Sequence, residues 1–301
     1  MRGKPMSRRA SELLLAGVIV ARATSYLFAK LVISGLGIFN LLALRFLLAF
    51  VLLSVLFLPR LRRIDRRSLR AGLIMGGMYF LVMTAELSGL KRTTSSNVSF
   101  LENTAIVIVP LLAALVYRRA PGRKAILCAA VTLAGVGLLT LGGGVRFGLG
   151  EAFALLAATL YAGAILTTDR LTHHGKIDPL AAGIVQVATI GVLSLFASCI
   201  METPRLPQGG TEWLSVVALA VVCSGFGFTL QPVAQAGTTA ERAGMFCALN
   251  PLVASVLGVV FLREHIGAQG ILGAAFILAG ILLSYAKLPE RLPCRRRKQF
   301  T

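Results

Sequence analysis

The chain has 301 residues, of which 56% are hydrophobic and 14% charged, and its mean hydropathy is +0.80. A soluble domain carries about 25% charged residues, so this composition excludes an ordinary water-soluble domain. A net charge of +19 could indicate nucleic-acid binding, but the Lys and Arg residues form short clusters between apolar runs, as in the cytoplasmic loops of membrane proteins. We therefore expect the lipid bilayer, and no nucleic acid, as a partner.

Ten apolar runs follow one another along the chain, joined by short polar turns. A helix needs about 20 apolar residues to cross the hydrocarbon layer, and the runs are close to that length. The sequence thus predicts an all-α, polytopic membrane protein with ten transmembrane helices. The runs cover residues 11–33, 38–58, 71–90, 96–117, 125–141, 151–169, 179–201, 213–234, 243–262 and 267–286.

The basic residues predict the orientation of these helices. If the N-terminus is cytoplasmic, the segments on that side hold 23 Lys and Arg residues and the outer segments hold 6. The positive-inside rule then places both termini in the cytoplasm, together with a basic tail at 287–301. We expect a multi-pass protein of the inner (cytoplasmic) membrane of a bacterium.

The two halves of the chain show a weak internal repeat. LAGVGLL at 133–139 aligns with LAGILL at 278–283 at an offset of 145, which also places Arg119 on Glu264. Five runs lie in each half, and an odd number of helices per repeat forces the two repeats into opposite orientations, a common arrangement in transporters. We therefore expect inverted five-helix repeats at 11–141 and 151–286.

Several stretches, taken in order, resemble the drug/metabolite transporter superfamily, EamA type, over nearly the whole chain. The resemblance implies a secondary transporter without enzyme activity or cofactor, often an exporter of small metabolites or drug-like solutes, that works by alternating access. The family's glutamate after the fourth helix of each repeat is present as Glu264 but is Arg119 in the first half, and its Trp-Gly is Arg22-Ala23 here. The matching stretches are TSYLFAK (24–30), LLALRFLLAF (41–50), TTSSNVSFLENTAIVIVPLLAAL (93–115), TTDRL (167–171), GFTLQPVAQ (227–235) and ERAGMFCALNPLVASVLGVVFLREHIGAQGILGAAFILAGI (241–281).

Away from the ends of the predicted spans, the ionisable residues are few: Arg22, Arg45, Glu86 and Glu102, with Lys30 at a helix end. Such residues cost at least about 2.5 kcal/mol each to insert, so they are candidates for function. One interpretation makes Glu102, or else Glu86, the coupling or substrate-binding acid, with Arg22 or Arg45 as counter-ion or anchor for an anionic substrate group. The other is a static buried salt bridge. For Arg45 a structural ion pair or a snorkelling side chain is favoured.

Polar residues near these positions complete the candidate site. Asn103 adjoins Glu102, and Asn250 precedes a proline at a similar depth in the ninth run. Gln231 and Gln235 are spaced i, i+4 and share a helix face. Each could line a substrate pathway, and each could equally satisfy a kinked helix or an interhelical hydrogen bond. No spacing of His, Cys or acidic residues predicts a metal site.

Two other classes remain open from sequence. An intramembrane lipid-modifying enzyme would need a nucleophile–base pair or a metal cluster at one depth, and a non-transporting membrane subunit would need an exposed partner groove. A polar cavity that opens to one side and is lined by helices of both repeats would favour the transporter, whose partner is a small-molecule substrate. The sequence also leaves open a homodimer.

Overall fold

The computed structural model describes residues 6–93, 95–118, 122–140, 148–174, 177–253, 256 and 268–285. These residues form helices joined by short turns, with no strand among them, and they confirm the all-α prediction. The expectations for Arg119, Glu264 and the tail at 287–301 fall outside the described residues. The helices are α1 (Arg8–Ala23), α2 (Ser25–Leu36), α3 (Ile38–Leu61), α4 (Arg66–Arg92), α5 (Ser95–Asn103), α6 (Ala105–Tyr117), α7 (Arg123–Thr140), α8 (Leu149–His174), α9 (Pro179–Met201), α10 (Gly210–Ala218), the π-helix η1 (Leu219–Phe228), α11 (Thr229–Gln235), α12 (Ala240–Phe246) and α14 (Ala268–Tyr285).

Seven helical segments of the described chain are long and apolar enough to cross a membrane, so the protein is a multi-pass membrane protein. They coincide with seven of the ten predicted runs. The other three runs correspond to α7, to the shorter apolar α14, and to α12 with helical residues 249–253, beyond which most of the ninth run lies outside the described residues. The seven segments are Arg8–Leu36, Ile38–Leu61, Arg66–Arg92, Val98–Tyr117, Leu149–His173, Pro179–Met201 and Gly210–Gln235.

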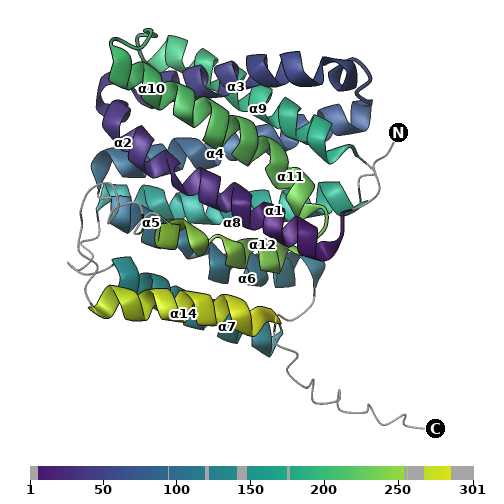
Figure 1. Cartoon of the computed structure of the whole chain (residues 1–301), viewed down its shortest axis with the longest axis vertical. Helices are drawn as coiled ribbons and strands as arrows, with labels where there is room; N and C mark the ends of the chain where they lie inside the picture. The colour runs from purple at the N-terminus through teal and green to yellow at the C-terminus, as the bar shows by residue number, and fades with distance from the viewer. Residues whose placement is uncertain are drawn as a thin grey trace.

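The helices lie side by side and form a stack that runs down the long axis of the molecule (Figure 1). At one end α3 packs against α9, and at the other α7 packs against α14. Between them α4 packs against both α8 and α9, while α1 packs against η1 and α11. The middle of the stack is therefore enclosed by helices from both halves of the chain.

Glycines allow α4 and α9 to approach closely. A Cβ atom on Gly72 would lie 2.7 Å from the carbonyl oxygen of Ala182, and one on Gly76 would lie 3.0 Å from that of Gln186. Only hydrogen fits at these distances, so the two helix backbones are nearly in contact. Small residues commonly mediate such contacts between membrane helices, where the hydrophobic effect does not favour helix association.

The α7–α14 contact is also built on glycines. A Cβ atom on Gly135 would lie 2.7 Å from the backbone nitrogen of Ile277, and one on Gly280 would lie 3.1 Å from the backbone nitrogen of Thr132. Moving three residues back along α7, from 135 to 132, therefore means moving three residues forward along α14, from 277 to 280. The two helices are antiparallel.

Several long spans are interrupted partway along their length. The first is split into α1 and α2 at Thr24, and the fourth into α5 and α6 at Thr104. At both breaks the threonine hydroxyl donates to the carbonyl three residues earlier, at 2.7 Å to Ala21 and 2.6 Å to Leu101. At Leu101 the hydroxyl adds to a hydrogen bond from the Thr104 backbone nitrogen at 3.1 Å. The carbonyl oxygens beside each break are therefore hydrogen-bonded, a requirement that hydrocarbon makes strict.

Prolines account for two further irregular stretches. Pro232 has no N–H to offer the carbonyl of Phe228, at the end of η1, and that oxygen accepts instead from the side-chain nitrogen of Gln186 at 3.4 Å. Pro251 likewise cannot reach the carbonyl of Cys247, which accepts from the backbone nitrogen of Asn250 at 2.9 Å. The interruption expected beside Asn250 is therefore present, in the turn after α12.

Polar contacts connect helix ends and turns in two separate groups. In one, Arg60 at the end of α3 contacts Asp178 before α9 at 2.6 Å, and Glu12 on α1 contacts Arg242 on α12 at 2.8 Å. In the other, the carboxylate of Glu202 accepts from the first backbone nitrogens of α3, and the Lys30 ammonium, in the middle of α2, donates to the carbonyl of Leu90 in the last turn of α4 at 2.7 Å. In the described chain, the turn after α3 therefore meets the segment before α9 at one end of α3, and the segment after α9 meets the other end of α3.

Candidate functional site

A small cavity lies in the middle of the helix stack. The volume that the centre of a water molecule can occupy inside it is about 10 Å³. Helices of both halves contribute to its wall, and all four predicted intramembrane ionisable residues are among the contributors. The lining residues are Arg22, Ser25, Tyr26, Arg45, Met83, Glu86, Glu102, Phe228 and Asn250.

Arg22, in the last turn of α1, is held by partners from three other elements. Its Nη1 donates to the hydroxyl of Tyr161 at 3.0 Å and to Oε1 of Gln231 at 2.8 Å. Its guanidinium carbon lies 4.3 Å from the ring centroid of Phe228, close enough for a cation–π interaction. A Cβ atom on Gly227 would lie 2.8 Å from Cγ of Arg22, so a glycine in η1 makes room for the arginine stem.

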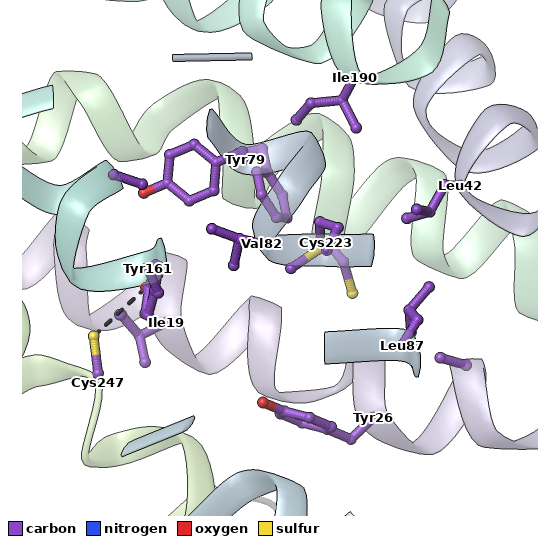
Figure 2. Packing of buried hydrophobic residues seen from close by; sticks show 14 of the residues in the cluster. Ile19, Tyr26, Leu42, Tyr79, Val82, Leu87, Tyr161, Ile190, Cys223 and Cys247 are labelled. Atoms are coloured by element: carbon purple, nitrogen blue, oxygen red, sulfur yellow. Dashed lines mark hydrogen bonds between the residues drawn. The ribbon is translucent and has the colours of Figure 1, made fainter. Parts of the chain in front are cut away.

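Two tyrosines extend the hydrogen-bond network around Arg22. The side-chain nitrogen of Gln231 donates to the hydroxyl of Tyr79 at 2.5 Å. The rings of Tyr79 and Tyr161 pack edge to face with centroids 6.1 Å apart, and the Cys247 thiol donates to the Tyr161 hydroxyl at 3.5 Å (Figure 2). The network therefore links α1, α4, α8, α11 and the turn after α12 around one cation.

The two glutamates have different surroundings. Glu102 on α5 is 3% exposed, and its carboxylate accepts a hydrogen bond from the hydroxyl of Tyr26 on α2. Glu86 on α4 is 5% exposed and lines the cavity, and no described residue donates a hydrogen bond to it. An ionised carboxylate accepts hydrogen bonds through both oxygens, so Glu86 retains capacity for a proton or a ligand.

Arg45 on α3 has few polar partners. It is 2% exposed, its Nη2 donates to the sulfur of Met83 at 3.2 Å, and its Nε has no hydrogen-bond partner among the described residues. Within the same residues, no carboxylate oxygen lies within 4.0 Å of the guanidinium of Arg45 or of Arg22. Neither interpretation favoured from sequence, a structural ion pair or a snorkelling side chain, describes Arg45 in this structure.

The uncharged candidates separate into two groups. Asn250 lines the cavity and Gln231 contacts Arg22, whereas Asn103 and Gln235 are buried outside the cavity wall. The amide nitrogen of Asn103 donates to the carbonyl of Ser99 at 2.6 Å, a contact within its own helix. The structure therefore brings two of the four polar candidates to the site.

Sequence reasoning missed the aromatic residues of the site. Tyr26 follows Arg22 by four residues and Tyr79 precedes Glu86 by seven, spacings that share a helix face and could have indicated them. Tyr161 and Phe228 carry no such signal, because each meets Arg22 only through the tertiary fold.

Apolar helices that span a membrane and enclose a polar cavity with buried ionisable side chains define a multi-pass membrane protein with an internal site. The sequence profile of the EamA-like transporter family matches residues 9–141 and 148–286. The chain belongs to that family, as the sequence resemblance indicated.

Relatives agree with this assignment over most of the chain. An uncharacterized transporter of Archaeoglobus fulgidus is 25% identical over 280 residues, which cover 92% of this chain and 86% of that protein. The uncharacterized transporter YetK of Bacillus subtilis is 23% identical over 94% of this chain and 90% of its own. A solved crystal structure superposes with a TM-score of 0.76 at 20% identity, covering 92% of this chain and 97% of that one, so the two share a fold.

Proposed function

We propose that the protein is a secondary active transporter, rather than an enzyme, that moves a small metabolite or drug-like solute across the cytoplasmic membrane by alternating access. The observation that carries this proposal is the meeting of Arg22, Arg45, Glu86 and Glu102 at one buried cavity. Ionisable groups at membrane depth are costly and typically mark substrate or ion pathways. Their convergence from four elements fits a binding site better than four separate structural roles.

We further propose ten helices in two inverted repeats, 11–141 and 151–286, with both termini cytoplasmic. The α7–α14 contact supports this arrangement. Gly135 and Gly280 are related by the offset of 145, and so are Thr132 and Ile277. A two-fold axis between the halves exchanges Gly135 with Gly280 and Thr132 with Ile277. If Gly135 lies close to Ile277, Gly280 must then lie close to Thr132. Both approaches are present, on antiparallel helices.

Glu102 is the proposed coupling residue, with Glu86 as the second candidate. Both carboxylates line the cavity, so either can exchange a proton with whichever side the cavity opens to. A proton gradient directed into the cell would then drive solute outward, in the exporting direction that the family resemblance implies.

Transport by reconstituted protein tests this proposal. A thermal-shift screen first identifies a solute that stabilises the purified protein, because a ligand of the folded state raises its apparent stability. Glu102→Gln should still bind that solute but lose flux driven by a pH gradient in proteoliposomes, since the amide cannot carry a proton. Glu241→Gln, at an exposed position on α12, is the matched control and should retain flux. Unchanged pH-driven flux in Glu102→Gln would eliminate its coupling role and direct attention to Glu86.

A further inference from the structure

We propose that Arg45 binds an anionic group of the transported solute, so that the substrate class is a small organic anion such as a carboxylate. This inference rests on the proposed function, because it takes the central cavity to be the transport site. It extends that function by assigning the group that the substrate must carry.

The unused hydrogen-bonding capacity of Arg45 is the first observation. A guanidinium is always charged and has five N–H donors in a planar fork. In the described part of the chain the sulfur of Met83, a weak acceptor, is the one hydrogen-bond partner of Arg45, and its Nε has none. Its guanidinium carbon also lies 4.7 Å from the ring centroid of Phe46, a contact that uses none of the N–H donors of the fork. A buried cation without acceptors is strongly unfavourable, and a carboxylate that accepts two parallel hydrogen bonds is its best geometric complement.

A comparison of the hydrogen-bond partners of the two arginines favours Arg45 over Arg22 as the anion-binding residue. Arg22 already donates to Tyr161 and Gln231 and lies against the ring of Phe228. An anion that bound Arg22 through Nη1 would have to displace these contacts. Arg45 lines the same cavity and also lies near a ring, that of Phe46, but among the described residues it has no oxygen acceptor. An anion that binds there gains hydrogen bonds and competes with at most one weak N–H···S contact.

The rest of the cavity wall suits an organic anion. Phe228 and Met83 offer apolar surface, and the side-chain oxygen of Asn250 lacks a partner among the described residues and could accept from a hydroxyl or amide of the solute. The present space takes about one water molecule, so the helices must move apart to admit the solute.

The charges around the cavity predict how neighbouring substitutions affect binding. Arg22 on α1 and Arg45 on α3 face Glu86 on α4 and Glu102 on α5, with the neutral Tyr26 on α2. A monoanion therefore adds negative charge to a cavity that is neutral when all four groups are ionised. Removing the charge of Glu86, which has no hydrogen-bond donor in the described chain, should favour the anion.

Anion-dependent stabilisation of the purified, full-length protein tests the proposal. The probes are propionate, benzoate and methanesulfonate, with propionamide and benzamide as neutral counterparts, all at constant ionic strength and read out as apparent melting temperature. At least one anion should stabilise the wild type, and its neutral counterpart should not. Arg45→Met should weaken anion binding by at least about 30-fold, since it removes one partner of a buried charge pair. Glu86→Gln should tighten it by about tenfold or more, through loss of a like charge in low dielectric.

Two further variants keep the test decisive. Arg170→Met removes an exposed arginine from α8 and should leave the anion-dependent shift unchanged. If Arg45→Met does not fold, Arg45→Lys keeps the charge without the planar fork and should weaken binding by about tenfold, the loss of one good charge-assisted hydrogen bond.

Several results would overturn the proposal. These are no anion-dependent shift in the wild type, an undiminished shift in the Arg45 variants, or an equal loss in Arg45→Met and Glu86→Gln. A neutral solute that wild type and Arg45→Met transport equally would also overturn it while leaving the transporter function intact. Absence of flux for every solute that binds the wild type would instead contradict the proposed function.

Discussion

Arg22 on α1 and Arg45 on α3 are both buried and line the same cavity, but they differ in how well their N–H donors are satisfied. Both guanidinium groups lie near an aromatic ring, but Arg22 has two oxygen acceptors, whereas Arg45 has one weak sulfur acceptor among the described residues. Removing a group that satisfies buried partners leaves those partners without hydrogen bonds, and removing one that satisfies none does not. We therefore expect removal of Arg22 to destabilise the folded protein and removal of Arg45 not to.

We expect Arg22→Met to destabilise the ligand-free protein by about 2–4 kcal/mol, because Gln231 and Tyr161 would each lose a charged hydrogen-bond donor. Arg45→Met should be neutral or stabilising, because it replaces a poorly satisfied buried cation by an apolar side chain. Apparent melting temperatures in detergent, measured without added solute, compare the two. A larger loss for Arg45→Met than for Arg22→Met would show that Arg45 has a structural role.

The ionisable residues of the site were predictable from sequence, but their partners were not. Charge within an apolar run is rare enough to identify Arg22, Arg45, Glu86 and Glu102 without a structure. Tyr161 lies 139 positions from Arg22, in an apolar helix where a single tyrosine would be interpreted as an ordinary core residue. Whether Arg22 or Arg45 has hydrogen-bond acceptors depends on such distant partners. The ion pair expected at Arg45 could therefore not be checked from sequence.

Helix packing at α4 depends on which face a glycine occupies. Gly76 points at α9, where a Cβ atom would lie 3.0 Å from a backbone oxygen, whereas nothing lies within 4 Å of a Cβ atom on Gly77. A methyl group at position 76 must push the two helices apart. One at position 77 enters open space.

Gly76→Ala should therefore destabilise the protein by about 1–3 kcal/mol, the usual cost of forcing extra volume into a packed contact. Gly77→Ala, one residue away in the same helix, should be neutral or stabilise it by about 0.5–1 kcal/mol, because alanine is the better helix former. Thermal unfolding of the two variants in the same detergent measures the difference. Equal effects at both positions would contradict the observed α4–α9 approach.

Hydrophobicity predicted the element boundaries, and a proline predicted the interruption beside Asn250, but other interruptions within the spans depend on tertiary contacts. The apolar runs 38–58 and 179–201 coincide closely with α3 and α9. The break at Thr24 and the π-helix η1 were not expected, since their local sequences continue the apolar pattern. The break leaves the carbonyl of Ala21 open to the thiol of Cys223 in η1, at 3.2 Å, a partner more than 200 positions away.

At the scale of the whole molecule, the described turns that polar contacts join divide into two groups at opposite ends of the helices. The basic turn after α3 contacts the segment before α9 through Arg60 and Asp178. The segment after α9 contacts the start of α3 through Glu202. The charge split of 23 to 6 predicts which group faces the cytoplasm, because basic loops are retained on that side.

Cysteine labelling in intact cells distinguishes the two faces. Gln208, exposed between α9 and α10, belongs to the end with Glu202, and Arg63, exposed between α3 and α4, belongs to the end with Arg60. A membrane-impermeant maleimide should label Gln208→Cys in intact cells but label Arg63→Cys only after the membrane is permeabilised. The unsubstituted chain measures the background from its own five cysteines. Replacing Arg63 leaves the large excess of inner charge in place, so the substitution should not reverse the orientation. Labelling of Arg63→Cys alone in intact cells would mean that the protein inserts in the opposite orientation, and labelling of both would contradict the alternation of turns on which the ten-helix topology depends.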